Sequence, residues 1–151
     1  GVGTTFHLYF PRTSAPDQET ATLEKPLRQG TETILLTEDE EGVRESTAQM
    51  LRIVGYTVLP ARDGTEAIAL AESHTAPIHL LLTDVIMPGM NGAELRDALL
   101  TRSPTLRVLF MSGYAGTVIS SQGVLAPGTH FIQKPFTMQE LAEAVRHALD
   151  D

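Results

Sequence analysis

An alternation of short apolar runs with helix-forming stretches is the feature that most constrains the fold of this chain. From Thr33 onward the two patterns alternate five times within about 120 residues. The apolar runs, which predict five strands, are residues 34–36, 56–59, 78–83, 106–111 and 130–132. Such strand and helix pairs predict an α/β fold, a parallel sheet with helices on both faces.

The stretches between the runs indicate helices. Residues 43–54 carry apolar side chains at spacings of three and four, and Gly55 is expected to end that helix. Thr137, with Glu140 three residues later, predicts a capping box at the start of the last helix. Residues 115–121 predict only a weak helix, because they are rich in β-branched residues.

Composition excludes several classes of protein. The chain has 151 residues, no Cys, and 11 basic against 19 acidic residues, for a net charge of −8. This charge argues against direct binding of nucleic acid, and the lack of Cys excludes disulfides and thiolate zinc sites. No apolar run is long enough to cross a bilayer, and residues 1–10 lack the features of a signal peptide. We therefore expect a cytoplasmic protein or fragment that makes no membrane contact itself.

Residues 12–31 differ in character from the rest of the chain. They are rich in Thr, Ser and Pro and show no apolar period, which is typical of a linker. The alternating patterns all lie within residues 32–151, which we therefore expect to form one folded domain.

Polar side chains follow four of the predicted strands. Glu38 and Asp39 come after the first strand, Asp84 after the third, Ser112 after the fourth and Lys134 after the fifth. In open α/β sheets, ligands bind at the carboxyl ends of the strands. If the first and third strands are neighbours, three carboxylates, a hydroxyl and an ammonium meet at one edge of the sheet.

That set of groups suits phosphoryl transfer. Crowded carboxylates repel one another, and Mg²⁺, which prefers oxygen ligands and keeps waters and a phosphate oxygen, relieves the repulsion. An Asp carboxylate can then accept a phosphoryl group covalently. Lys134 and Ser112 can each hold a phosphoryl oxygen.

Residues 32–151 resemble the receiver (CheY-like) domain of two-component response regulators. The resemblance is carried by the strand and acid pair at 34–39, by Asp84 with Met-Pro-Gly-Met-Asn-Gly at 87–92, and by the segments 111–114 and 134–136. It implies a flavodoxin-like sheet with strand order 2-1-3-4-5. It also implies that the chain catalyses only its own phosphorylation and dephosphorylation.

The resemblance assigns a role to each residue of this edge. Asp84 would be the phosphoacceptor and Asp39 a direct Mg²⁺ ligand, with Glu38 acting on the metal through water. The main-chain carbonyl of Ile86 would complete the protein ligands. The phosphoryl donor would be a histidine-kinase phosphohistidine domain, in cis or in trans, with a histidine phosphotransfer protein as a further partner.

The resemblance also implies a switch. Ser112 and Lys134 would hold the phosphoryl group, and Phe131 stands at the place of the family's mobile aromatic residue. Phe131 has no hydroxyl, where Tyr is frequent, so a core-filling role remains the alternative for it. The Lys134–Pro135 bond is often cis in the family.

Residues 1–11 carry a second resemblance. They look like the last glycine-rich box and final strand of a histidine-kinase ATP-binding domain. Together with the receiver resemblance, this suggests the C-terminal part of a hybrid sensor histidine kinase whose parent protein is membrane-anchored. The chain has no other ATP-site box and no phosphoacceptor-histidine helix, so we expect no kinase activity from it.

Two other functions remain open from the residues. The first is an Mg²⁺-dependent phosphohydrolase of similar fold, although haloacid-dehalogenase-type enzymes require a second Asp where this chain has Ile86. The second is a receiver that binds partners without phosphorylation. The five histidines do not cluster along the sequence, and we expect surface or packing roles for them.

Overall fold

The computed structural model describes residues 3, 4, 7, 9, 29–113 and 129–151. In chain order the elements are β1 (Thr33–Thr37), α1 (Glu41–Ile53), β2 (Thr57–Ala61), α2 (Gly64–Ser73), β3 (Leu80–Asp84), α3 (Gly92–Arg102), β4 (Arg107–Ser112), β5 (His130–Gln133) and α5 (Met138–Asp150). The helix expected at 115–121 lies outside the described residues, as do most of residues 1–28. No helix within the described ranges is both long and apolar enough to cross a membrane.

The five strands form one parallel sheet in the order β2-β1-β3-β4-β5. This confirms the predicted fold class and strand order. All five residues of β1 are buried, as are the first four of β3. Because helices cover both faces of a parallel sheet, its central strands are apolar along their whole length rather than on alternate residues.

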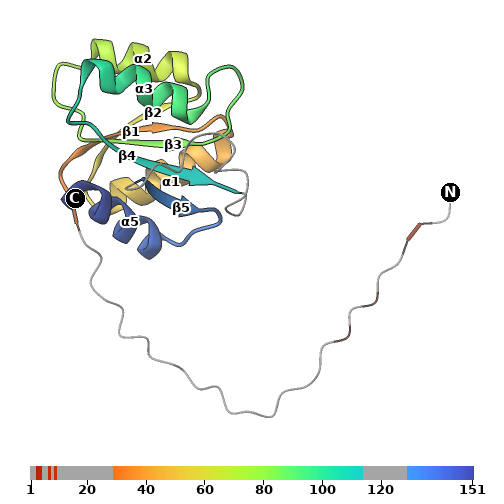
Figure 1. Ribbon diagram of the computed structural model, residues 1–151. Helices are drawn as coiled ribbons and strands as arrows, with labels where there is room; N and C mark the ends of the chain where they lie inside the picture. The colour runs from red at the N-terminus through yellow and green to blue at the C-terminus, as the bar shows by residue number, and fades with distance from the viewer. Residues whose placement is uncertain (1–2, 5–6, 8, 10–28, 114–128) are drawn as a thin grey trace.

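Each face of the sheet has its own apolar core. Helices α1 and α5 cover one face, and α2 and α3 cover the other (Figure 1). Ile34 and Leu36 of β1 pack in the core with Val145 of α5, whereas Leu35 packs in the core with Leu95 of α3. Successive side chains of β1 therefore supply both cores in turn.

Most predicted element boundaries agree with the structure to within a residue or two, and the second strand shows why they differ. The pattern predicts an end at Leu59, but β2 continues through Pro60 to Ala61. Pro60 pairs with Leu36 at the edge of the sheet. An edge strand tolerates proline because only one side of it must complete a ladder of hydrogen bonds.

Side-chain caps define where three helices begin. Asp63 accepts a hydrogen bond from the Glu66 amide at the start of α2. Asn91 and Thr137 each form a capping box, the latter with Glu140 as predicted. Such caps satisfy amide groups that have no partner within the helix. Gly55, with φ of 100°, follows the end of α1, also as predicted.

Residues 30–32 join the domain at the amino end of β1. The Gly30 amide donates to the Val54 carbonyl oxygen at 3.0 Å. Glu32 accepts a hydrogen bond from Arg146 of α5, with 2.8 Å between Oε1 and Nη1. The chain therefore enters the sheet beside the last turns of α5.

The start of α3 packs closely on the end of β3, and this contact gives a test of the fold. A Cβ atom at Gly92 would lie 2.3 Å from the Asp84 carbonyl oxygen, which is main chain and cannot turn aside. We expect Gly92→Ala to lower the free energy of unfolding by about 1–3 kcal/mol in urea titrations.

Gly42→Ala is the matched control, since a Cβ atom in α1 at Gly42 meets nothing within 4 Å. Alanine there should be neutral or stabilising by up to about 1 kcal/mol. A Gly92→Ala variant as stable as the wild type would contradict the packing of α3 on β3.

Candidate functional site

Three carboxylates meet at the carboxyl ends of β1 and β3. Glu38 and Asp39 directly follow β1, and Asp84 is the last residue of β3. The two strands are neighbours, with Thr37 opposite Thr83. One oxygen from each carboxylate lies within 4.8 Å of the others. The predicted convergence of the three acids is therefore seen in the structure, and we call this group the acid cluster.

The three acids differ in burial. Glu38 is only 1% exposed, the Asp84 side chain is 14% exposed, and Asp39 is open to solvent. A buried carboxylate is costly unless it is paired and hydrogen-bonded. Glu38 therefore needs a partner, while Asp84 and Asp39 remain accessible to a ligand from solvent.

Lys134 is the partner of the acid cluster. It follows β5, and its Nζ lies 2.5 Å from Glu38 Oε2 and 2.6 Å from Asp84 Oδ2. Since β5 is separated from β3 by β4, the lysine side chain reaches past the end of β4 to both carboxylates. Hydrogen bonds between ionised groups are short and strong, and here they join three strands at one edge.

The pKa values of the pair follow from burial and charge. Burial raises the pKa of Glu38 above its ordinary value of 4.5, and although Lys134 opposes this rise, the charge of Asp84 adds to it. Burial alone would lower the pKa of Lys134, but its hydrogen bonds to Asp84 and Glu38 outweigh that effect and raise it. The ammonium therefore stays protonated at neutral pH, while the charged form of Glu38 is disfavoured.

Hydrogen bonds that involve the main chain hold the acids and the loop after β1 in place. The Ile86 amide donates to Asp84 Oδ1 at 3.2 Å, and the Glu40 amide donates to Glu38 Oε1 at 3.3 Å. Arg44 of α1 donates from Nη1 to the Glu38 carbonyl oxygen at 2.8 Å. Sequence reasoning missed Arg44, and no motif marks it. Arg44 reaches the Glu38 carbonyl oxygen only because it lies near the start of α1, next to the loop that follows β1.

Ser112 and Lys134 are brought together at the end of β4. Ser112 is the last residue of β4 and is buried, one residue beyond the pairing of Asp84 with Met111. The Lys134 amide donates to the Ser112 carbonyl oxygen at 2.8 Å. The Lys134–Pro135 bond is cis, as expected from the resemblance. Ser112 therefore stands at the same edge as Asp84, on the adjacent strand.

Phe131 lies on β5, opposite Phe110 of β4. It is half-buried and packs against the small apolar cluster of Val85 and Phe110. Val85 directly follows the phosphoacceptor candidate Asp84, so the apolar cluster on which Phe131 packs extends to the residue next to the acid cluster. Its role as a mobile switch stays a prediction.

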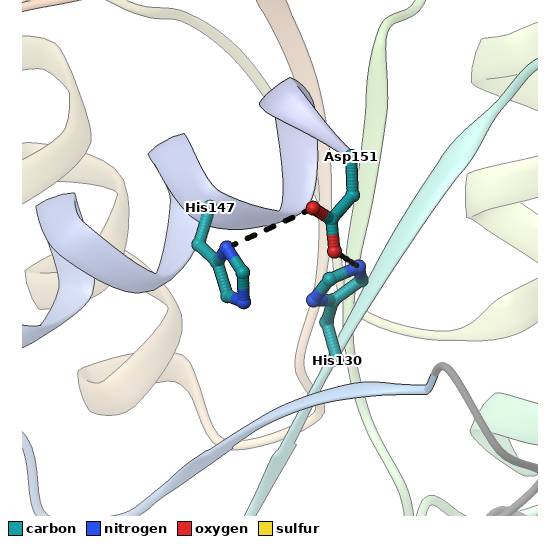
Figure 2. A group of neighbouring side chains, drawn as sticks. All are labelled: His130, His147 and Asp151. Carbon is teal, nitrogen blue, oxygen red and sulfur yellow. Dashed lines mark ion pairs between the residues drawn. The ribbon is translucent and has the colours of Figure 1, made fainter.

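The expectation that the histidines do not cluster is wrong for two of them. The ring centroids of His130 and His147 are 5.1 Å apart, and the two rings are nearly perpendicular. Both residues lie beside Asp151 (Figure 2). They are 17 positions apart in the sequence. Helix α5 runs back along the sheet, antiparallel to β5, and this return brings its end to the start of the strand (Figure 1).

Comparison with known proteins identifies the family. The family described as "Response regulator receiver domain" matches residues 34–146. The sensor kinase CckA of Brucella abortus is 33% identical over 159 residues, which covers 99% of this chain but 17% of CckA. The response regulator receiver protein CpdR of the same organism is 29% identical, covering 77% of this chain and 95% of CpdR.

Solved structures show the same fold. The receiver domain of the hybrid histidine kinase CckA has a TM-score of 0.65 and 40% identity, covering 78% of this chain and 98% of that domain. The chemotaxis protein CheY4 of Vibrio cholerae has a TM-score of 0.70 and 26% identity, covering 80% of this chain and all of CheY4.

The share of each relative that the chain covers varies widely. It spans 17% of CckA and 31% of a cyclic di-GMP phosphodiesterase of Thermotoga maritima, but nearly the whole of CpdR. All of these matches include the receiver domain. With the family match over residues 34–146 and the CheY-like sheet, this chain belongs to the response regulator receiver domain family of two-component systems.

Proposed function

We propose that this receiver accepts a phosphoryl group from a phosphohistidine onto Asp84. The observation that carries the proposal is the acid cluster with the Lys134 ammonium at its centre. Glu38 is too deeply buried to meet an incoming phosphoryl group. Asp84 is partly open to solvent, and its Oδ2 contacts the Lys134 ammonium.

In the proposed reaction a carboxylate oxygen of Asp84 forms a bond to phosphorus as the phosphorus–nitrogen bond of the phosphohistidine breaks. The electron pair of that bond passes to the imidazole nitrogen. Lys134, 2.6 Å from Asp84 in this structure, donates to an oxygen of the transferred group. Ser112, at the end of the adjacent strand, is proposed to hold another phosphoryl oxygen.

The acid cluster fits a magnesium ion. Its donors are carboxylate oxygens, and three carboxylates against one ammonium leave an excess of negative charge that suits a divalent cation. When bound, Mg²⁺ offsets negative charge on the phosphoryl oxygens.

We propose different roles in metal binding for the exposed and the buried acids. We propose Asp39, Asp84 and the Ile86 main-chain carbonyl as direct ligands, since Asp39 and Ile86 are exposed and Asp84 is partly so. Glu38, buried and bound to Lys134, is proposed to act through water.

The proposed output of phosphorylation is a change in the balance of two conformations. Ser112 and Phe131 lie on β4 and β5, and Phe131 packs against the cluster that contains Val85, the residue after Asp84. A phosphoryl group on Asp84 draws Ser112 toward it, and Phe131 moves into the space that is left. This shifts the surface around β5 that a partner reads.

The likeness to CckA supports a place for this receiver beside a histidine kinase. The 33% identity extends over 99% of the chain, and so includes residues before the receiver. We propose residues 1–11 as the end of a kinase ATP-binding domain, 12–31 as a linker and 32–151 as the receiver, within a membrane-anchored hybrid kinase whose receiver lies in the cytoplasm. A phosphohistidine domain, or a histidine phosphotransfer protein, is the proposed partner.

Intact mass spectrometry tests the phosphoacceptor. With acetyl phosphate and Mg²⁺, the wild-type chain should gain one adduct of about 80 Da. Asp84→Asn should gain none, because the attacking carboxylate is missing, and EDTA should abolish the wild-type adduct. Asp97→Asn, which alters an exposed carboxylate on α3, is the matched control and should be phosphorylated normally.

Two outcomes would contradict the proposed function. An adduct on Asp84→Asn would place the chemistry on another residue. Steady release of phosphate from acetyl phosphate, or from other phosphate esters, with no adduct would favour the phosphohydrolase.

Glu38→Gln tests the electrostatics of the acid cluster. At pH 7.5 in EDTA we expect a higher midpoint of urea unfolding than in the wild type, because burial of the charged Glu38 disfavours the folded state. The folded protein binds this proton more tightly than the unfolded chain. As the pH falls through the raised pKa of folded Glu38, toward the ordinary value of 4.5, the wild type regains stability. The difference in urea midpoint between the wild type and Glu38→Gln therefore becomes smaller.

Glu40→Gln is the control for this measurement, since it neutralises an exposed carboxylate two residues away and should change the midpoint little. Saturating Mg²⁺ should also narrow the gap, because the metal favours the charged carboxylate. A Glu38→Gln variant less stable than the wild type at pH 7.5 would mean that the bond to Lys134 outweighs burial.

A further inference from the structure

We propose that His130, His147 and Asp151 form a second metal site, one that binds Zn²⁺. The three side chains point toward one another between the start of β5 and the end of α5 (Figure 2). This group, which we call the histidine site, lies at the amino end of β5, whereas Lys134 and the acid cluster lie beyond the carboxyl ends of the strands.

The ligand atoms are already close to the spacing of a zinc site. His130 Nε2 lies 3.4 Å from Asp151 Oδ2, and His147 Nδ1 lies 4.0 Å from Asp151 Oδ1. Two ligands bound at about 2.0–2.1 Å to one tetrahedral Zn²⁺ stand about 3.3–3.4 Å apart. All three ligand atoms lie within 4.8 Å of one another, so small side-chain rotations suffice to bind one ion.

The elements that carry the ligands make this approach possible. His147 and Asp151 are four residues apart at the end of α5 and lie on one face of it. The His130 side chain is only 19% exposed and is held by the sheet, while His147 is 71% and Asp151 57% exposed. One ligand is therefore fixed, and two are free to close on an ion that enters from solvent.

The nearby charges do not oppose a cation. Arg146, beside His147, places its guanidinium 2.8 Å from Glu32 Oε1 and 2.9 Å from Asp150 Oδ1. These two carboxylates neutralise the one guanidinium. Asp151 then adds a further negative charge at the histidine site itself.

The donor set distinguishes the histidine site from the acid cluster. Two imidazoles and one carboxylate suit Zn²⁺ and similar transition metals, whereas an all-carboxylate group suits Mg²⁺. The sequence has no Cys, so nitrogen donors for such a metal come from histidine. Zinc at this position joins α5 to β5, the strand that carries Phe131 and directly precedes Lys134.

Calorimetric titration of Zn²⁺ into the full chain tests the proposal, at pH 7.5 with millimolar Mg²⁺ present to compete for the acid cluster. The expected result is one Zn²⁺ per chain. His130→Gln and His147→Ala should each weaken binding by about tenfold or more, because each removes a ligand. Thermal unfolding should show a rise in Tm with Zn²⁺ in the wild type and a smaller rise, or none, in these variants.

Three controls make the test specific. His7→Ala removes an exposed histidine outside the site and should leave the affinity unchanged. Asp84→Asn, which alters the acid cluster, should also leave it unchanged, and this result does not depend on whether Asp84 accepts phosphate. His147→Ala should keep the wild-type Tm in EDTA, since the side chain is largely exposed.

The proposal is overturned if the wild type binds no Zn²⁺. In that case the two histidines only contact Asp151 and form no metal site. The proposal is also overturned if His130→Gln and His147→Ala bind as tightly as the wild type. Loss of binding in Asp84→Asn would move the zinc to the acid cluster, and equal losses in His7→Ala and His147→Ala would indicate non-specific binding to histidine.

Discussion

The interaction on which the site depends is that of one ammonium with two carboxylates. Lys134 reaches from the end of β5 to Glu38 after β1 and Asp84 at the end of β3. The burial of Glu38 is tolerable because this cation accompanies it. The strand order 2-1-3-4-5 is equally necessary, since it makes β1 and β3 neighbours and leaves β5 within reach past the end of β4.

The crowding of charge to which we assign phosphoryl transfer works against stability. Three carboxylates lie close together, of which two contact the Lys134 ammonium, and burial raises the pKa of the innermost acid, Glu38, so its charged form is held at a cost. Natural proteins accept such local conflicts mainly where function requires them. In the proposed function, a divalent cation and a phosphoryl group would both act on this unbalanced charge, and through it on the neighbouring Ser112 and Phe131.

The short strand β5 connects two chemically different ends of the domain. At its start His130 faces the last turn of α5, and just past its end Lys134 enters the acid cluster. Between them Phe131 packs against the cluster of Phe110 and Val85, the latter being the residue that follows Asp84. If both proposed sites bind their ligands, each ligand contacts a group at one end of this strand: the Lys134 side chain just past its end, or His130 at its start.

The sequence by itself determined the features that depend on local pattern. The α/β alternation, the capping box at Thr137 and the polar residues after each strand are short-range signals, set by side-chain periodicity and hydrogen bonds within a few residues. Only the tertiary structure decided that Lys134 bridges both Glu38 and Asp84, that Arg44 holds the loop after β1, and that His130 meets His147. These contacts join distant parts of the chain, and they exist because helices packed across a sheet return the chain to places that no local pattern specifies.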